Sequence, residues 1–387
     1  MLVLLVLLYA AFGLISRSIF PLVTPILADL RLSYSQMGFI LGSWQLTYIF
    51  AALVAGAVLD RWGVRKSIFA GAIIIGLSAS LRYFTVGFIS MLAAVALFGV
   101  GGPMISVGGP KVIAFWFRGR SRGTAMGIYT TGSWFGGLTA LALTNSLVMP
   151  LVGHSWRFTF VFYGLTAFAV ALLWYVLAEA GGSGTLQERS GIVAVFGQLV
   201  RIRNVRILLA MGLLAFAIIH GFSSWLPKIL EDSGLSAARA GWAAALAIAT
   251  GIPSILILPS VVPPRLRGRM IALFALLTAG HLFLVLKASG IALYIFLAVL
   301  GFAIAPFMAM LLLILMDSAG VETRHMGSAG GMFFCVAEIG GFTGPLIMGI
   351  LVDATGTFMA GAMFLAGLCL VMAVLTAMLD AGADLRG

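Results

Sequence analysis

The chain has 387 residues, of which 62% are hydrophobic and only 9% are charged, and its formal net charge is +11. So little charge excludes a soluble protein, because a soluble exterior needs charged side chains. The basic residues lie in short segments between apolar stretches, where membrane insertion alone explains them, so the positive balance does not indicate binding of nucleic acid.

Apolar stretches of about 18–25 residues recur along the chain, and this is the length that a helix needs to cross a bilayer. The sequence lacks the alternating segments of about ten residues that a membrane β-barrel requires. We therefore predict an all-α polytopic membrane protein with twelve transmembrane helices. The spans are expected near residues 2–26, 36–59, 67–86, 88–114, 123–147, 157–178, 206–227, 239–261, 270–287, 291–316, 326–351 and 358–379.

The first span contains an arginine, Arg17, inside the apolar run "LISRSIFPL" (14–22). The preceding residues lack the basic start and the small-residue cleavage site of a signal peptide, so we expect them to span the membrane. An arginine at the hydrocarbon centre costs about 2.5–3.5 kcal/mol on insertion scales. A rise of about 1.5 Å per residue places Arg17 somewhat past the midplane. Because something must offset this cost, Arg17 is a functional candidate.

The segment "GAVLDRWGVRKS" (56–67) joins the second and third spans and concentrates charge. Gly63 allows a tight turn between two helices. Asp60 ends the second span, and its cationic neighbours are Arg61, Arg65 and Lys66. The simplest interpretation is that these positive charges hold the loop in the cytoplasm.

Three further residues stand out on the fourth and fifth spans. Lys111 lies on the fourth span, and the aromatic residues Tyr129 and Trp134 lie deep on the fifth. Both rings are candidates to line a cavity, although aromatic residues in spans more often pack than bind. Glycines four residues apart, at 123/127, 132/136 and 327/331, predict close approach between helices.

One long stretch, "EAGGSGTLQERSG" (179–191), reads as a flexible linker. We therefore divide the chain into an N-terminal six-helix bundle (1–178), a cytoplasmic linker (179–205) and a C-terminal six-helix bundle (206–387). With the N-terminus inside, most Lys and Arg residues fall on the cytoplasmic side. The positive-inside rule thus predicts that both termini are cytoplasmic.

The two halves repeat each other at an offset of 203–204 residues. "LSYSQMG" (32–38) aligns with "LSAARAG" (235–241), and Asp29 aligns with Asp232. The pairs Gly123/Gly127 and Gly136/Gly137 align with Gly327/Gly331 and Gly340/Gly341. A constant offset with six spans per copy indicates parallel repeats related by an axis along the membrane normal.

On these residues the chain resembles the major facilitator superfamily of secondary transporters over essentially its whole length. The segment 56–67 follows that superfamily's pattern G-x-x-x-D-R-x-G-R-[RK], with Val64 in place of the first basic residue. "WFRGRSRGTAMGIYTTGSWFGG" (116–137) and "SWRFTFVFYG" (155–164) support the resemblance. Chain length and the region of the fourth and fifth spans look most like the small bacterial carriers of cyanate, nitrate, and oxalate and formate.

The resemblance implies that segment 56–67 is a conformational latch. Asp60 would dock on the positive N-terminal end of the eleventh span, near Met326, and close the cytoplasmic side in one state. The corresponding segment of the second half, "PPRLRGR" (263–269), has no acid, so the latch would be one-sided. Gly63, Arg61, Arg65 and Lys66 would complete it.

The resemblance also implies that the first and seventh spans line a central cavity. His220, on the seventh span, is the repeat mate of Arg17 and is expected at similar depth. The rigid fork of an arginine suits a carboxylate or another small oxyanion. Three interpretations of Arg17 stay open at this stage, namely substrate contact, pairing with Glu338 on the eleventh span, and snorkelling to the headgroups.

Glu338 lies near the middle of the bilayer, where a charged carboxylate is costly. It is therefore a candidate for proton coupling, together with His220, and a static ion pair with Arg17 or Lys111 is the alternative. Lys111 and Asp317 lie at similar depth on repeat-related spans, so they are candidates for an inner-gate ion pair. Lys111 is also a candidate to contact a substrate anion.

These residues predict a secondary transporter that moves a small organic or inorganic anion by alternating access, coupled to a proton or to an exchanged anion. A proton-coupled exporter of hydrophobic or cationic compounds is the alternative. An enzyme is not expected, because no nucleotide loop, metal cluster or acid–base pair in one pocket is apparent. Cys335 and Cys369 both lie in apolar spans, so neither a disulfide nor a metal site is expected. We expect a monomer in a bacterial or archaeal cytoplasmic membrane, with no cofactor and no nucleic-acid partner.

Overall fold

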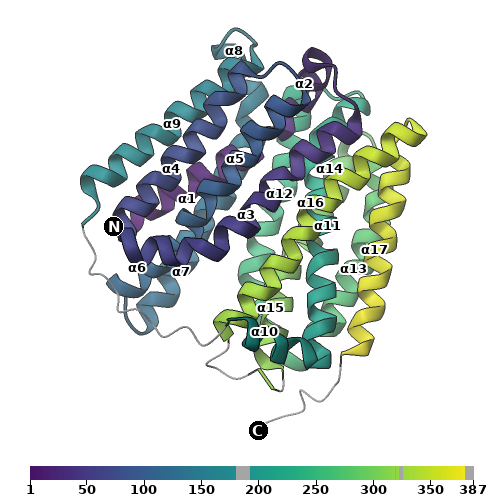
Figure 1. The fold of residues 1–387 in the computed structure, drawn as a ribbon. Coiled ribbons are helices and arrows are strands. Elements are labelled where there is room, and N and C mark those ends of the chain that lie inside the picture. Colours follow the sequence, from purple (N-terminus) through teal and green to yellow (C-terminus); the bar gives the residue numbers. More distant parts are fainter. Residues whose placement is uncertain (180–191, 319, 322–325, 380–387) are drawn as a thin grey trace. The chain divides into compact units, whose positions relative to one another are not determined.

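The computed structural model of the protein describes residues 1–179, 192–318, 320–321 and 326–379. Within these residues the chain is helical, and 12 helices are long and apolar enough to cross a membrane (Figure 1). The predicted polytopic all-α fold is thereby confirmed. The terms outer and inner refer to the orientation that the positive charges predict.

The first six spans contain several interrupted helices. Their elements are α1 (Leu2–Arg17), η1 (Phe20–Leu22), α2 (Val23–Leu30), α3 (Tyr34–Trp62), α4 (Val64–Leu81), η2 (Arg82–Phe84), α5 (Phe88–Ser106), α6 (Gly108–Trp116), α7 (Arg120–Leu143), η3 (Thr144–Val148), α8 (Met149–Leu151) and α9 (Trp156–Leu177). Proline explains two of the breaks, because its ring clashes with the carbonyl four residues earlier. Pro21 thus ends α1 at Arg17, and Pro110 ends α5 at Ser106.

The remaining spans follow a short helix within the predicted linker. Their elements are α10 (Ile192–Arg201), α11 (Arg203–Asp232), α12 (Ala237–Val261), α13 (Pro264–Lys287), α14 (Gly290–Ile304), α15 (Phe307–Asp317), α16 (Met326–Thr355) and α17 (Phe358–Met378). The linker sequence 179–191 lies almost entirely outside the described residues. The rest of the predicted linker is helical, since it contains α10 and the start of α11.

By their contacts the residues form two compact units. Unit 1 comprises Met1–Leu186 and Ser224–Ala245, and unit 2 comprises Gln187–Ser223 and Leu246–Gly387. These units differ from the bundles expected from the repeat, because the outer ends of α11 and α12 belong to unit 1. The division into bundles at 178 and 206 describes the repeat and stays a prediction.

The repeat is visible as one close helix contact that occurs in each unit. A Cβ atom on Gly136 of α7 would collide with the carbonyl oxygen of Ala10 on α1. A Cβ atom on the repeat mate Gly340 of α16 would likewise collide with the carbonyl oxygen of Leu213 on α11. The glycines expected to pack at 123/127 and 327/331 differ, since a Cβ atom there would meet nothing within 4 Å.

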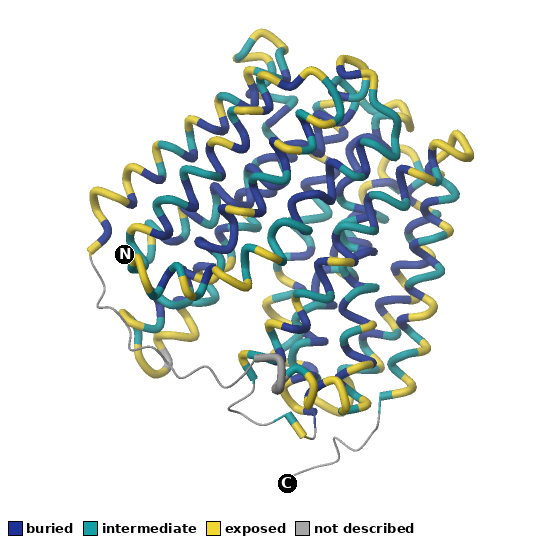
Figure 2. Tube along the Cα trace, in the orientation of Figure 1, coloured by how far each residue is buried: buried dark blue, intermediate teal, exposed yellow. Residues whose placement is uncertain are grey.

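Burial follows the pattern of a protein in a bilayer. Buried positions lie mostly toward the interior of each unit (Figure 2). Many large apolar side chains are exposed along the helices. On α9, for example, Leu172, Val176 and Leu177 are exposed. Apolar faces of this extent on an isolated soluble protein would be a liability, whereas lipid tails cover them in a membrane.

Candidate functional site

Arg17 lies at the end of α1, where Pro21 breaks the helix. The Arg17 side chain lies against α7. Its Nη1 atom is 3.5 Å from the carbonyl oxygen of Ser133, and its guanidinium carbon is 5.9 Å from the centre of the Trp134 ring. The alkyl part of the side chain passes over Gly137, where a Cβ atom would come within 2.5 Å of Arg17 Cδ. The absence of a side chain at Gly137 therefore makes room for the arginine.

Within the described residues of unit 1, no carboxylate forms an ion pair with Arg17. The guanidinium carries five N–H donors, and one long hydrogen bond to Ser133 uses only one of them. An uncompensated arginine beside an indole ring is suited to bind an anion through two parallel hydrogen bonds. The structure thus brings Arg17 and Trp134 together, and their shared role in substrate binding stays a prediction.

Tyr129, by contrast, is placed as a packing residue. It is only 1% exposed, its hydroxyl donates to the carbonyl oxygen of Ile105 at 2.9 Å, and its ring stacks on Tyr9 at 4.4 Å. Ile105 lies just before the break between α5 and α6, so the hydrogen bond satisfies a carbonyl near the end of a helix. In this conformation Tyr129 is covered, which argues against the substrate contact expected for it.

His220 and Glu338 both belong to unit 2, and a contact between two phenylalanines joins their helices, α11 and α16. The ring of Phe216 is 5.1 Å from that of His220 on α11 and 6.4 Å from that of Phe334 on α16. Glu338 follows Phe334 by one helical turn, on the same side of α16. It is 8% exposed, and its Oε2 atom lacks a hydrogen-bond partner among the described residues. A buried carboxyl without a partner is costly when charged, so this position favours a group that can hold a proton.

The residues predicted to form an inner gate each have a partner within their own unit. Lys111 on α6 forms an ion pair with Asp60 at the end of α3. Asp317, at the end of α15, pairs with Arg267 of α13, whose Nη1 atom is 2.5 Å from Asp317 Oδ2. The expected pair Lys111–Asp317 would join the two units, and it stays a prediction.

The loop around Gly63 is anchored to α9. Gly63 has a φ of 80°, a left-handed conformation that glycine adopts freely, and it separates α3 from α4. Arg65 donates to the carbonyl oxygen of Tyr175 through Nε at 3.0 Å, and Trp174 donates to the carbonyl oxygen of Arg65 at 3.0 Å. Arg61 and Lys66 are exposed, so they have no packing role in this conformation.

The outer end of unit 1 holds a polar group that the sequence analysis did not find. Asn145 lies in the π-helical turn η3 that continues α7, and its amide donates to the carbonyl oxygen of Pro21 at 2.8 Å and to that of Ala237 at 3.4 Å. The hydroxyl of Thr24 on α2 donates to the Glu231 carboxylate at the end of α11. These contacts attach the outer ends of α11 and α12 to the first and fifth spans.

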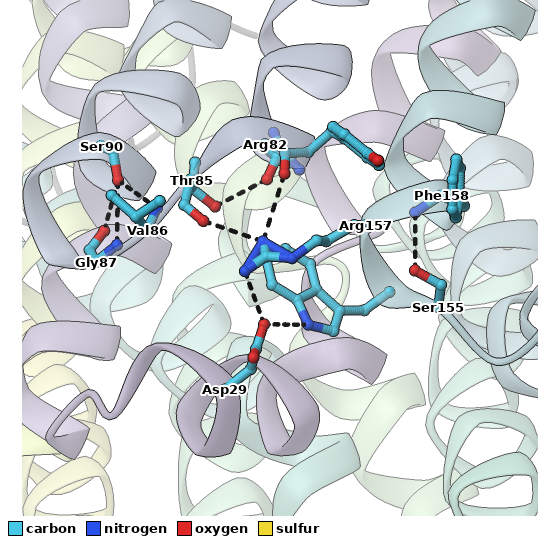
Figure 3. Close-up of polar contacts among 11 residues, drawn as sticks. Asp29, Arg82, Thr85, Val86, Gly87, Ser90, Ser155, Arg157 and Phe158 are labelled. Atoms are coloured by element: carbon cyan, nitrogen blue, oxygen red, sulfur yellow. Dashed lines mark hydrogen bonds and ion pairs between the residues drawn. The ribbon is translucent and has the colours of Figure 1, made fainter.

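A second outer cluster joins α2 to α9 (Figure 3). Arg157 Nη2 is 2.8 Å from Asp29 Oδ2, and Trp156 donates to the same oxygen at 3.1 Å. Nη1 of Arg157 also donates to the carbonyl oxygen of Thr85 at 3.0 Å. The repeat mate of Asp29, Asp232, also forms an ion pair, but with Lys228 on its own helix, so the repeat did not indicate this cluster.

The twelve spanning helices, the internal repeat, and a cationic intramembrane residue beside an aromatic ring define a helical secondary transporter. The chain belongs to the Major Facilitator Superfamily, which it matches over residues 5–345. It is accordingly an integral membrane protein and a transporter, as the sequence predicted, and not an enzyme.

Proteins of known sequence and structure resemble the chain over nearly its whole length. The hexuronate transporter of Bacillus subtilis (strain 168) is 27% identical over 384 residues, which cover 91% of this chain and 87% of that protein. The probable galactarate/D-glucarate transporter GudP of the same organism is 23% identical over 395 residues, covering 92% and 85%. The crystal structure of the nucleoside transporter NupG superposes with a TM-score of 0.81 at 16% identity, covering 97% of this chain and 98% of that one. This last likeness concerns the fold.

Proposed function

We propose that this protein transports a small organic anion, a hydroxylated carboxylate of the sugar-acid class, across the bacterial cytoplasmic membrane. The observation that carries the proposal is the position of Arg17, which unit 1 leaves without a carboxylate partner and which lies against Trp134. Hexuronate, galactarate and D-glucarate, the substrates named for two relatives, all carry a carboxylate and several hydroxyls.

In this proposal the groups of the site divide the tasks of binding, coupling and gating. Arg17 binds the substrate carboxylate with two hydrogen bonds, and Trp134 packs against the carbon skeleton. His220 contributes a second polar contact from its repeat-related position, and Lys111 attracts the anion at the inner end. Glu338 takes up and releases the coupling proton, because its burial without a partner makes the charged form costly.

Alternating access supplies the movement, with the two six-helix bundles rocking around the site. At the outer end the contacts of Asn145 and Glu231 hold α11 and α12 to the first and fifth spans. At the inner end Asp60 acts as the latch, with Gly63, Arg61, Arg65 and Lys66 shaping its loop, and Lys111 and Asp317 form the gate pair in the closed state. Both termini lie in the cytoplasm, and the protein works as a monomer.

The test is a counterflow assay in proteoliposomes with labelled glucuronate, galactarate and D-glucarate. We expect wild-type protein to exchange at least one of them and Arg17→Gln to weaken apparent affinity by about tenfold or more, since hydrogen bonds to charged groups contribute about 1.5–3 kcal/mol. Arg239→Gln, which removes an exposed outer arginine, is the matched control and should behave as wild type. Exchange of lipophilic cations in place of these acids, or equal effects of both variants, would contradict the proposal.

A further inference from the structure

The inner end of unit 2 gathers a group of arginines that the transport mechanism does not use. Four of them are exposed and define what we call the arginine patch, Arg201, Arg206, Arg265 and Arg269. Arg201 ends α10, and Arg206 lies in the first turn of α11, so a short stretch of chain carries both. Arg265 and Arg269 lie in the first two turns of α13.

A short segment after α15 brings the two halves of the patch together. On one side Asp317 pairs with Arg267, which lies between the two patch residues of α13. On the other side Gly320 packs on Ile202. A Cβ atom added to Gly320 would lie 3.1 Å from Ile202 Cδ1. Three residues of fully extended chain span at most about 11 Å, so the start of α13 and the junction between α10 and α11 lie near each other.

Among the described residues, the local charge of this surface is positive. Within the part of the chain that the structure describes, Asp317 is the acidic residue at this surface, and its ion pair with Arg267 neutralises its charge. The first turns of α11 and α13 contain no acidic residue, although their partial positive charge favours one. Arginines at these positions add positive charge to positive helix ends, so the surface is complementary to an anion that comes from outside the chain.

The surroundings identify the kind of anion. Exposed apolar side chains flank the patch, with Val200 43% exposed, Leu266 39% exposed and Val261 62% exposed. A soluble anion needs no apolar neighbour, whereas a phospholipid offers a charged headgroup and apolar tails together.

We propose that the arginine patch binds the phosphate headgroups of anionic phospholipids in the cytoplasmic leaflet, and that Val200, Val261 and Leu266 lie against their acyl chains. Such patches beside transmembrane helices are suited to lipids of this charge. The proposal is separate from the transported substrate, because it uses none of the residues placed at the central site.

The test compares two double variants of the patch with a matched control. Arg201→Gln/Arg206→Gln and Arg265→Gln/Arg269→Gln remove two charges each from the patch. Arg118→Gln/Arg122→Gln removes two exposed arginines from the inner end of unit 1 and serves as the control. Binding of dioleoyl-phosphatidylglycerol and dioleoyl-phosphatidylcholine to the purified protein is measured by native mass spectrometry, and a thermal melt in neutral detergent confirms folding.

We expect wild type and control to prefer phosphatidylglycerol, and each patch variant to bind it about tenfold more weakly with unchanged melting temperature. Equal loss in the control variant would show that any cytoplasmic arginine serves, and would overturn the proposal. Displacement of the lipid by millimolar inorganic phosphate would assign the patch to soluble anions and would overturn it too. Equal binding of both lipids by wild type would have the same consequence.

Discussion

The side-chain amide of Asn145 donates to the carbonyl oxygen of Pro21 at 2.8 Å, and this contact joins two irregular places in the protein. Asn145 lies in a π-helical turn at the end of α7, and Pro21 lies in the 3-10 turn that breaks the first span. The same amide reaches the carbonyl oxygen of Ala237 at the start of α12. A π-turn often occurs at functional positions, and here it aims one polar side chain at two helix ends.

Asn145→Ala should therefore loosen the outer end. Each hydrogen bond contributes about 0.5–1.5 kcal/mol, so we expect outer opening to become about threefold to tenfold more frequent. The measurement is the rate at which an impermeant maleimide labels Trp134→Cys from outside, in a background without native cysteines. Ser146→Ala is the control, because the Ser146 hydroxyl bonds only within its own helix, to Ala142 at 2.5 Å. Unchanged labelling in Asn145→Ala would show that this amide does not hold the outer end.

Thr24 and Glu231 should behave as one unit in a double-mutant cycle. Thr24→Val and Glu231→Ala each remove the hydrogen bond between α2 and α11, which involves a carboxylate and contributes about 1.5–3 kcal/mol. We expect the outer labelling rate of the double variant to exceed that of either single variant only slightly. Strict additivity of the three labelling rates would mean that the two side chains act independently.

Tyr129→Phe separates a packing role from a binding role. The change leaves the buried carbonyl of Ile105 without its donor, which costs about 1–3 kcal/mol, so the melting temperature should fall. The apparent KM for the transported acid should stay within about twofold of the wild-type value, since the ring is covered. A raised KM with an unchanged melting temperature would restore Tyr129 to the substrate site.

Asp60 and Lys111 form a pair that is about one-third exposed, and such pairs contribute about 0–1 kcal/mol to stability. Asp60→Asn should nevertheless slow transport by about tenfold, because the proposed latch docks the Asp60 carboxylate on the positive N-terminal end of α16. Lys111→Gln should slow it less. Transport rates in proteoliposomes, normalised to inserted protein, measure both. Equal losses would mean that the ion pair alone accounts for the effect.

Glu338→Gln should abolish accumulation driven by a proton gradient and preserve exchange of substrate for substrate, because exchange needs no net proton movement. Parallel assays of gradient-driven uptake and counterflow test this in the same vesicles. Thr343→Val, five residues further along α16, is the control, since the Thr343 hydroxyl bonds within its own helix, to Gly340 at 3.3 Å. Gradient-driven accumulation by Glu338→Gln would assign the proton to another group.

Much of the fold could be predicted from sequence because a bilayer imposes a simple rule on it. Every span must be long and apolar, so hydropathy alone located all twelve. The repeat also aligned positions that make equivalent helix contacts in the structure, as Gly136 and Gly340 illustrate.

The site was less predictable, because its contacts depend on geometry that no local pattern encodes. Asp60 and Lys111 are 51 residues apart, and each has several candidate partners at similar depth. Asn145 acquires its role from a π-turn that disturbs helical periodicity, so a regular helix would have pointed its amide elsewhere. The burial of Tyr129 depends on how α7 packs on α1 and α6, which an apolar sequence does not specify.

The passage of α11 from one compact unit into the other has a mechanical consequence. The helix is unbroken from Arg203 to Asp232, yet its contacts change from unit 2 to unit 1 at Ser224. Pro227 lies three residues beyond that point and removes one rung of the hydrogen-bond ladder. A helix that lacks one hydrogen bond bends more easily at that point, so Pro227 is the position at which we expect α11 to flex.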